Sequence, residues 1–197
     1  MRVVALTGSV AAGKSSVGAL FRAWGATLID ADALVRELQR KGEPVFDAIV
    51  AAFGPDVVDA RGELDRPAMR HHMLADPTAK RRLEAIVHPA FEIRRRALVE
   101  AARARGDAIV IAEIPLLFEA ADPAAYDGVV VVDAPVAERR RRLQQARGFS
   151  AHDADQLIAA QLPATEKRAR ATWIIDNDAD RAMLETRTRA VWDALRR

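Results

Sequence analysis

The 197-residue chain contains no cysteine, few lysines and no long hydrophobic run. Without cysteine it has no disulfide, no thiolate metal site and no cysteine nucleophile. The apolar run after Met1 is too short for a signal peptide, and no stretch approaches the length that spans a membrane. Thirty basic residues nearly balance twenty-eight acidic ones, for a formal net charge of +2. This balance argues against nucleic-acid binding, so we expect a cytoplasmic protein without a nucleic-acid or membrane partner.

Lysine is scarce, because only four of the thirty basic residues are lysines: Lys14, Lys41, Lys80 and Lys167. Wherever a positive charge alone suffices, this chain carries arginine. A lysine at a motif position is therefore more informative here than in an average sequence.

Short apolar runs alternate with longer segments of helical periodicity, as in βαβ units whose parallel sheet is covered on both faces. With half of its residues apolar, a chain of this length can bury one substantial core. We predict a three-layer α/β fold with roughly five parallel strands, at residues 3–6, 27–29, 109–114, 129–132 and 173–175. The first helix is expected to end at Gly25, because glycine suits a left-handed cap.

The segment between the second and third predicted strands is longer than a connection requires. It carries helical patterns at residues 44–53, from about Pro67, and from Pro77, with Asp76 as the predicted N-cap. A basic helix is expected at 135–147, and another from a Ser150 cap to Gln161. We predict a single domain, 1–197, whose parts are a core (about 1–32, 107–135 and 172–197), a helical substrate-binding insertion (about 33–106) and a helical lid (about 136–165).

Residues 8–15, Gly-Ser-Val-Ala-Ala-Gly-Lys-Ser, match the pattern G-x-x-x-x-G-K-[ST] between a predicted strand and a predicted helix. Glycines let successive backbone N–H groups point inward, and the helix start adds the positive end of its dipole. In such a phosphate-binding loop (P-loop), Lys14 reaches the β- and γ-phosphates and the Ser15 hydroxyl binds Mg²⁺. We therefore predict that the chain binds ATP and Mg²⁺.

Acidic residues follow two predicted strands, at the edge of the sheet where ligands bind. Asp32 is predicted to orient the hydroxyl that accepts the phosphoryl group, with Asp30 closer to a structural role. The alternative is that one of them caps a helix beginning at Ala33. Glu113, late in the third strand, either acts on Mg²⁺ through water or is an exposed strand-end residue.

Four consecutive arginines, Arg139 to Arg142, radiate around the predicted basic helix, so at most one or two can face a common ligand. In a nucleotide kinase, such arginines neutralise charge on the transferring phosphoryl group from a mobile lid. A solvated basic face is the alternative, and it is favoured for Arg139 taken singly.

The P-loop alone does not separate a kinase from a nucleotide switch or a motor ATPase. No lysine has the N/T-K-x-D context that reads guanine, and the D-x-x-G match at 59–62 lies in a polar turn. A kinase is therefore preferred. A nucleoside monophosphate kinase is the nearest alternative, and a nucleotide-dependent switch is the alternative from another class.

Several motifs, in their order and spacing, resemble those of the dephospho-CoA kinase family over nearly the whole chain. They are Leu6-Thr7-Gly8, Ile29-Asp30-Ala31-Asp32, Leu83 to Pro89, Ile114 to Glu119, Val131-Val132-Asp133, Ala159-Ala160-Gln161 and Ile174 to Asn177. The resemblance implies ATP-dependent phosphorylation of the ribose 3′-hydroxyl of dephospho-CoA, the last step of coenzyme A biosynthesis. It implies no partner beyond ATP and dephospho-CoA, and we expect a monomer or a weak homo-oligomer.

The resemblance also implies roles for single positions. Catalytic roles fall on Asp32, Lys14 and Arg142. ATP-binding roles fall on Gly8, Ala11, Ala12, Gly13, Lys14, Ser15, Ser16 and Asn177. Acceptor-binding roles fall on Asp32, His88, Pro115 and Leu116. Taken alone, His88 is equally a packed residue before Pro89, and residues 176–178 are equally an ordinary turn.

The chain departs from the family's pattern at two places. Ser9 and Ala11 stand where the family's loop usually has more glycine, and a left-handed backbone would be strained at either residue. The usual second arginine of the lid, four residues after Arg142, falls on Ala146, with Arg147 adjacent.

Overall fold

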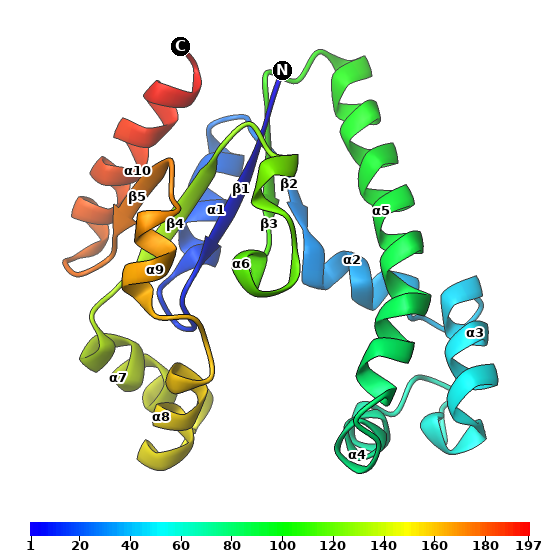
Figure 1. Ribbon diagram of the computed structural model, residues 1–197. Coiled ribbons are helices and arrows are strands. Elements are labelled where there is room, and N and C mark those ends of the chain that lie inside the picture. The colour runs from blue at the N-terminus through cyan, green and yellow to red at the C-terminus, as the bar shows by residue number, and fades with distance from the viewer. The chain divides into compact units, whose positions relative to one another are not determined.

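The computed structural model describes residues 1–197 and contains five strands. They are β1 (Arg2–Gly8), β2 (Thr27–Asp30), β3 (Ile109–Glu113), β4 (Val129–Asp133) and β5 (Trp173–Asp176). Every pairing is parallel, and the strand order is β2-β3-β1-β4-β5, which can be followed in Figure 1. The predicted α/β fold with a five-stranded parallel sheet is confirmed.

Ten α-helices and two short 3₁₀ helices connect and cover the strands. They are α1 (Lys14–Ala23), α2 (Ala31–Leu38), α3 (Pro44–Phe53), η1 (Pro55–Val57), α4 (Arg66–Ala75), α5 (Ala79–Arg105), α6 (Leu117–Ala120), η2 (Pro123–Ala125), α7 (Val136–Arg147), α8 (Ala151–Ala159), α9 (Ala164–Ala169) and α10 (Arg181–Leu195). None of these helices combines the length and the apolar character that crossing a membrane demands.

The chain divides into two compact units. The sheet unit comprises Met1–Ala31 and Ala101–Arg197, and the helical unit comprises Asp32–Glu100. The helical unit corresponds to most of the segment expected to be an insertion, and its role in covering a substrate stays a prediction.

Alternate residues of the strands pack on opposite faces of the sheet. Leu6 of β1 lies in a core with Phe21 of α1 and Trp192 of α10. Ala5, the preceding residue, packs on the other face with Leu117 of α6. Helices thus cover both faces, which explains why the strand sequences are apolar throughout rather than alternating.

Helix α1 ends at a left-handed glycine, as predicted. Gly25 has φ +104°, its amide donates to the carbonyl of Arg22, and the amide of Ala26 donates to the carbonyl of Phe21. These two bonds satisfy carbonyls that a helix end leaves unpaired, and they turn the chain toward β2.

The helical unit has a separate apolar core, built by side chains of α3, α4 and α5 that include Ile49, Phe53, Met69 and Val87. The predicted start of a helix at Pro77 is wrong, because α5 begins at Ala79. The carboxylate of Asp76 accepts hydrogen bonds from both the amide and the hydroxyl of Thr78, which holds this segment in a turn before the helix.

Candidate functional site

The predicted P-loop joins the central strand of the sheet to the start of a helix. β1 ends at Gly8, which has φ +150°, and a Cβ there would run into the carbonyl oxygen of Val132 on β4. Gly13, with φ +100°, precedes the helix, and a Cβ there would meet Nδ2 of Asn177. Both glycines of the motif are therefore required by backbone conformation and by close neighbours.

The backbone amides of the loop fall into two groups. The amide of Val10 donates to Oε1 of Gln161 at 2.8 Å, and the amide of Ala12 donates to the carbonyl of Ser9 at 3.1 Å. The second group makes no hydrogen bond and consists of the amides of Ala11, Gly13 and Ser15. Unpaired amides at the N-terminus of a helix are the arrangement that binds phosphate oxygens.

Ala11 is the one residue besides glycine with a positive φ, +58°. The strain expected at Ser9 or Ala11 therefore falls on Ala11. A left-handed conformation costs an L-residue about 1–2 kcal/mol, and it persists where neighbouring contacts fix it. Those contacts lie on both sides, at the Val10 amide held by Gln161 and at the carbonyl of Ala11 itself.

Arg142 of α7 and Asn177 after β5 bind the carbonyl side of the loop. Nη1 of Arg142 lies 3.2 Å from the oxygen of Ala11 and 3.3 Å from that of Ala12, and Nη2 lies 3.2 Å from the oxygen of Asn177. The buried side chain of Asn177 donates from Nδ2 to the oxygen of Ala12 at 2.7 Å. Carbonyl oxygens that would repel a phosphate are thus paired with donors.

Glu138 holds Arg142 from its other side. Its Oε1 accepts from Nε of Arg142 at 2.9 Å and from Nη2 of Arg141 at 2.6 Å. The hydrogen bond from Arg141, followed by that from Arg142, lowers the pKa of Glu138 from 4.5 to about 2, against the opposing effect of burial. The carboxylate is therefore ionised at neutral pH and fixes the guanidinium of Arg142 beside the loop.

Arg139 and Arg140 of α7 make their contacts away from the P-loop. Arg139 is buried, its Nε donates to the carbonyl of Ala134 at 3.0 Å, and burial lowers its pKa. The expectation that Arg139 belongs to a solvated face is therefore wrong. Arg140 pairs with Asp155 of α8 at 2.6 Å. Of the four consecutive arginines, Arg142 alone contacts the P-loop.

Lys14 and the two serines that follow lie in the first turn of α1. Nζ of Lys14 lies 3.4 Å from the carbonyl oxygen of Gly8, across the loop, and Ser15 and Ser16 are exposed. The half-buried Glu113 points toward α1, because its Oε2 lies 3.1 Å from the position that a Cβ on Gly18 would take. It is therefore not the exposed strand-end residue that was the alternative.

A cavity of about 790 Å³ opens beside the P-loop within the sheet unit. Gly13 and Ser15 lie at one end, and Arg142, Asn177 and Arg181 contribute polar groups. Its walls come from α1, α7 and the start of α10. A cavity of this size next to the unpaired amides can hold a nucleoside whose phosphates lie in the loop.

Two residues expected to act on the acceptor, Asp32 and His88, belong to the helical unit. Asp32 is exposed in the first turn of α2. Because that helix begins at Ala31, the expected start at Ala33 is wrong and Asp32 is not its N-cap. His88 is exposed on α5 and is followed by Pro89 inside the helix, so it is not the packed histidine of the alternative.

Pro115 and Leu116 lie in the sheet unit, between β3 and α6. The carbonyl of Pro115 accepts from the hydroxyl of Thr7 at 3.4 Å, and the Leu116 side chain is exposed. Their contact with an acceptor stays a prediction.

Gln161 was not predicted to take part in the site. It was expected to end the helix that Ser150 caps. The cap is confirmed, since the Ser150 hydroxyl accepts from the amide of Asp153, but α8 ends at Ala159. Gln161 therefore lies in the turn after α8, where its side chain reaches Val10. Two residues so far apart in the sequence produce no periodic pattern, so the sequence alone does not predict their contact.

Comparison with known proteins agrees with this geometry. A family model described as dephospho-CoA kinase matches residues 2–182. The chain belongs to the dephospho-CoA kinase family. It is 43% identical, over 194 residues, to the dephospho-CoA kinase of Symbiobacterium thermophilum, covering 98% of this chain and 81% of that protein.

Solved structures extend the similarity to the fold. A crystal structure of TT1252 from Thermus thermophilus superposes with a TM-score of 0.83 at 33% identity, covering 98% of this chain and 96% of that one. The dephospho-CoA kinase from Campylobacter jejuni gives a TM-score of 0.73 at 22% identity, covering 98% and 96%, a likeness that shows the fold alone. Family membership makes the chain a kinase rather than a nucleotide-dependent switch.

Proposed function

We propose that this member of the dephospho-CoA kinase family transfers the γ-phosphoryl group of ATP to the ribose 3′-hydroxyl of dephospho-CoA. The 3′-oxygen forms a bond to the γ-phosphorus, the bond from that phosphorus to the β–γ bridging oxygen breaks, and ADP leaves. The proton of the hydroxyl passes to a carboxylate. The products are coenzyme A and ADP.

The observation that carries this proposal is the P-loop with its unpaired amides, in a chain that matches the family over residues 2–182. The amides of Ala11, Gly13 and Ser15 supply donors for the phosphates. Phosphoryl transfer depends mainly on positioning and on neutralising charge, so a preformed cradle of donors accounts for much of the catalysis expected.

Asp32 is the carboxylate proposed to orient the acceptor hydroxyl and take its proton. It is exposed and follows the end of β2 by one intervening residue. Lys14 is proposed to move from the carbonyl of Gly8 to the β- and γ-phosphates. Arg142 is proposed to neutralise charge on the transferring group, for which one N–H of its Nη2 remains without a partner.

The residues present fit a magnesium ion that is held mainly by the phosphates of ATP. The structure contains no group of three or more acidic or histidine side chains suited to a metal. Mg²⁺ in kinases needs only one or two protein ligands, because phosphates and water supply the rest. Ser15 and, through water, Glu113 would hold it. When bound, the ion neutralises charge on the phosphates.

Release of ADP in a coupled assay tests the reaction, with dephospho-CoA, AMP and CMP compared as acceptors. We expect turnover to depend on dephospho-CoA, and Asp32→Asn to lower kcat by about 100-fold or more, as expected for loss of a general base. Asp47→Asn, which changes another exposed carboxylate of the helical unit, is the matched control. Hydrolysis of ATP at the same rate without any acceptor would contradict the proposal.

A further inference from the structure

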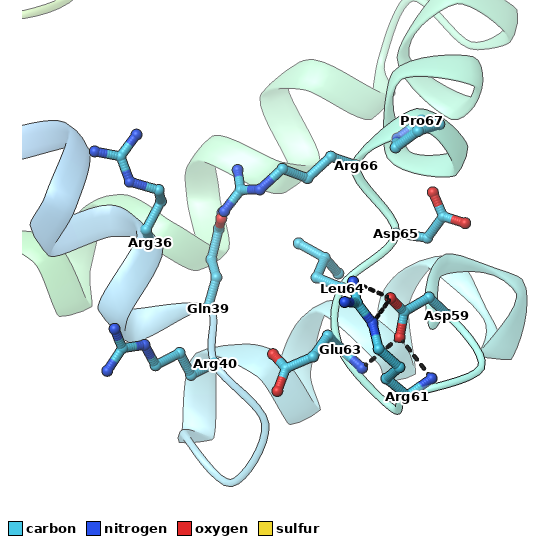
Figure 2. Close-up of a pocket in the computed structure, with 10 residues that line it drawn as sticks. All are labelled: Arg36, Gln39, Arg40, Asp59, Arg61, Glu63, Leu64, Asp65, Arg66 and Pro67. Carbon is cyan, nitrogen blue, oxygen red and sulfur yellow. Dashed lines mark hydrogen bonds and ion pairs between the residues drawn. The ribbon is translucent and has the colours of Figure 1, made fainter.

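The helical unit contains a pocket of about 540 Å³ that the P-loop chemistry does not use. It lies between the C-terminal end of α2 and the segment from Asp59 to Pro67. Figure 2 shows the arginines of this pocket: Arg36 from α2, Arg40 just after that helix, Arg66 from the start of α4, and Arg61, which is bonded to Asp59.

Two of the three acidic side chains of the pocket already accept hydrogen bonds. Asp59 accepts from the guanidinium and the amide of Arg61 and from the amide of Glu63, as the dashed lines in Figure 2 show. Asp65 caps α4 by accepting from the amide of Ala68 at 3.0 Å. The carboxylate of Glu63 is the one acidic group of the pocket without such a bond.

The other three arginines, in contrast, have no carboxylate partner within the helical unit. No ion pair or hydrogen bond joins the guanidinium group of Arg36, Arg40 or Arg66 to an acidic side chain there. Four arginines against three carboxylates line the pocket, so its net charge is +1, and three of the four guanidinium groups have no carboxylate partner there. An excess of guanidinium groups around a hollow is suited to a phosphate or diphosphate group, to which arginine binds through two parallel N–H donors.

The pocket is also aligned with the proposed catalytic carboxylate. Asp32 and Arg36 are four residues apart within α2, so they lie on one side of that helix, and Arg40 follows two residues after its end. One helical turn advances about 5.4 Å. A ligand whose hydroxyl lies at Asp32 and whose body follows this side of the helix therefore places its next polar group at Arg36.

We propose that Arg36, Arg40 and Arg66 bind the 5′-diphosphate of the acceptor, while its ribose 3′-hydroxyl lies at Asp32. This inference rests on the proposed function. In dephospho-CoA the 3′-hydroxyl and the 5′-diphosphate belong to the same ribose and are separated by a few bonds, which matches one helical turn. The competing explanation is that Arg36 and Arg40 only complement the negative end of the α2 dipole.

The test compares steady-state kinetics of Arg36→Gln, Arg40→Gln and Arg66→Gln with the wild type. The control is Arg81→Gln, which changes an exposed arginine of α5 outside the pocket. We expect each pocket variant to raise the KM for dephospho-CoA by about ten-fold, the loss of one charge-assisted bond, without changing the KM for ATP. Arg36→Lys should recover part of the loss, because it retains the charge but not the two parallel donors.

Adenosine, which has the 3′-hydroxyl but no 5′-phosphate, separates a diphosphate site from general damage. Its kcat/KM, or its inhibition constant against dephospho-CoA, should be the same in the wild type and the pocket variants. Equal losses for both ligands, or an unchanged KM for dephospho-CoA in all three variants, would overturn the inference. A wild type that binds dephospho-CoA in calorimetry but does not phosphorylate it would instead contradict the proposed function, and binding to the three variants would still test the pocket.

Discussion

At the scale of single residues, the P-loop depends on side chains that come from far along the chain. Ala11 has a left-handed backbone without being glycine, and the bonds that fix its neighbourhood come from Gln161 and Arg142. The amide of Val10 is bonded to Gln161, so it is not a donor for phosphate. Gln161 therefore has a positioning role, in which it fixes the loop conformation that leaves the next amide, that of Ala11, available.

Gln161→Ala removes this bond. A side-chain hydrogen bond contributes about 1 kcal/mol net, so we expect the dissociation constant for ATP to rise about five-fold. Isothermal titration calorimetry with a non-hydrolysable ATP analogue measures it. The effect should be smaller in an Ala11→Gly background, because glycine adopts the left-handed conformation without the strain that the bond helps to hold.

Gln144→Ala, which changes an exposed glutamine of α7, is the control for this pair. If Gln161→Ala weakened ATP binding equally in both backgrounds, the link to the strained residue would be wrong. If it had no effect in either, Gln161 would have no positioning role.

At the scale of elements, an ion pair with one buried partner joins α6 to α9. Lys167 is 1% exposed, and its Nζ lies 2.8 Å from Oε1 of Glu119. This distance makes the contact an ion pair. The ammonium group of Lys167 donates no hydrogen bond of good geometry to any acceptor. The same carboxylate accepts from the amide of Leu162 at 3.2 Å, so the pair also fixes the segment that follows Gln161.

The two partners should differ sharply when removed. Glu119→Gln leaves a buried, uncompensated ammonium group and is expected to cost about 3 kcal/mol of unfolding free energy. Lys167→Met removes the buried charge and leaves a carboxylate that water can reach, so its cost should be smaller, and adding Glu119→Gln to it should cost little more. Urea unfolding measures all three, with Glu166→Gln as an exposed control. Equal costs for the two single variants would contradict this account.

On α7, the Glu138 carboxylate makes stability depend on pH. Its pKa is lowered from 4.5 to about 2 in the folded protein, so its contribution is fully present above pH 4.5 and is lost as the pH falls toward about 2. Unfolding midpoints in urea across this range should fall less steeply for Glu138→Gln than for the wild type. Glu185→Gln on α10 is the control, and a slope unchanged by Glu138→Gln would show that the ion pairs with Arg141 and Arg142 do not stabilise the fold.

The strands and most of the longer helices were predictable because their signals are local in sequence. A strand buried on both faces is a short apolar run, and a helix is marked by its cap and by the glycine or proline that ends it. Helices α6 and α9 were not predicted, since four and six residues are too few for a helical period. The P-loop was predictable because its glycines and lysine are consecutive. The roles of Gln161 and Arg139 were not, because each depends on which distant backbone atom the side chain meets.

At the scale of the whole molecule, the proposed roles are divided between the two compact units. The unpaired amides and the cavity beside them belong to the sheet unit, and Asp32 and the arginine pocket belong to the helical unit. Each substrate is therefore expected to stabilise mainly the unit that it contacts. A ligand at 100 times its dissociation constant stabilises the state that binds it by about 2.7 kcal/mol, which is large enough to slow amide hydrogen exchange.

Hydrogen exchange followed by mass spectrometry can resolve this division. A non-hydrolysable ATP analogue with Mg²⁺ should slow exchange in the loop before α1, at the start of that helix and around Asn177. Dephospho-CoA alone should slow exchange in α2 and in residues 59–67. In Lys14→Ala, protection by the ATP analogue should be lost and protection by dephospho-CoA should be kept. In a combined Arg36→Gln and Arg40→Gln variant, protection by dephospho-CoA should be lost and protection by the ATP analogue should be kept. Protection of residues 59–67 by the nucleotide alone, or of the P-loop alone by dephospho-CoA, would contradict this division, because neither ligand would then act on the unit whose donors match its phosphates.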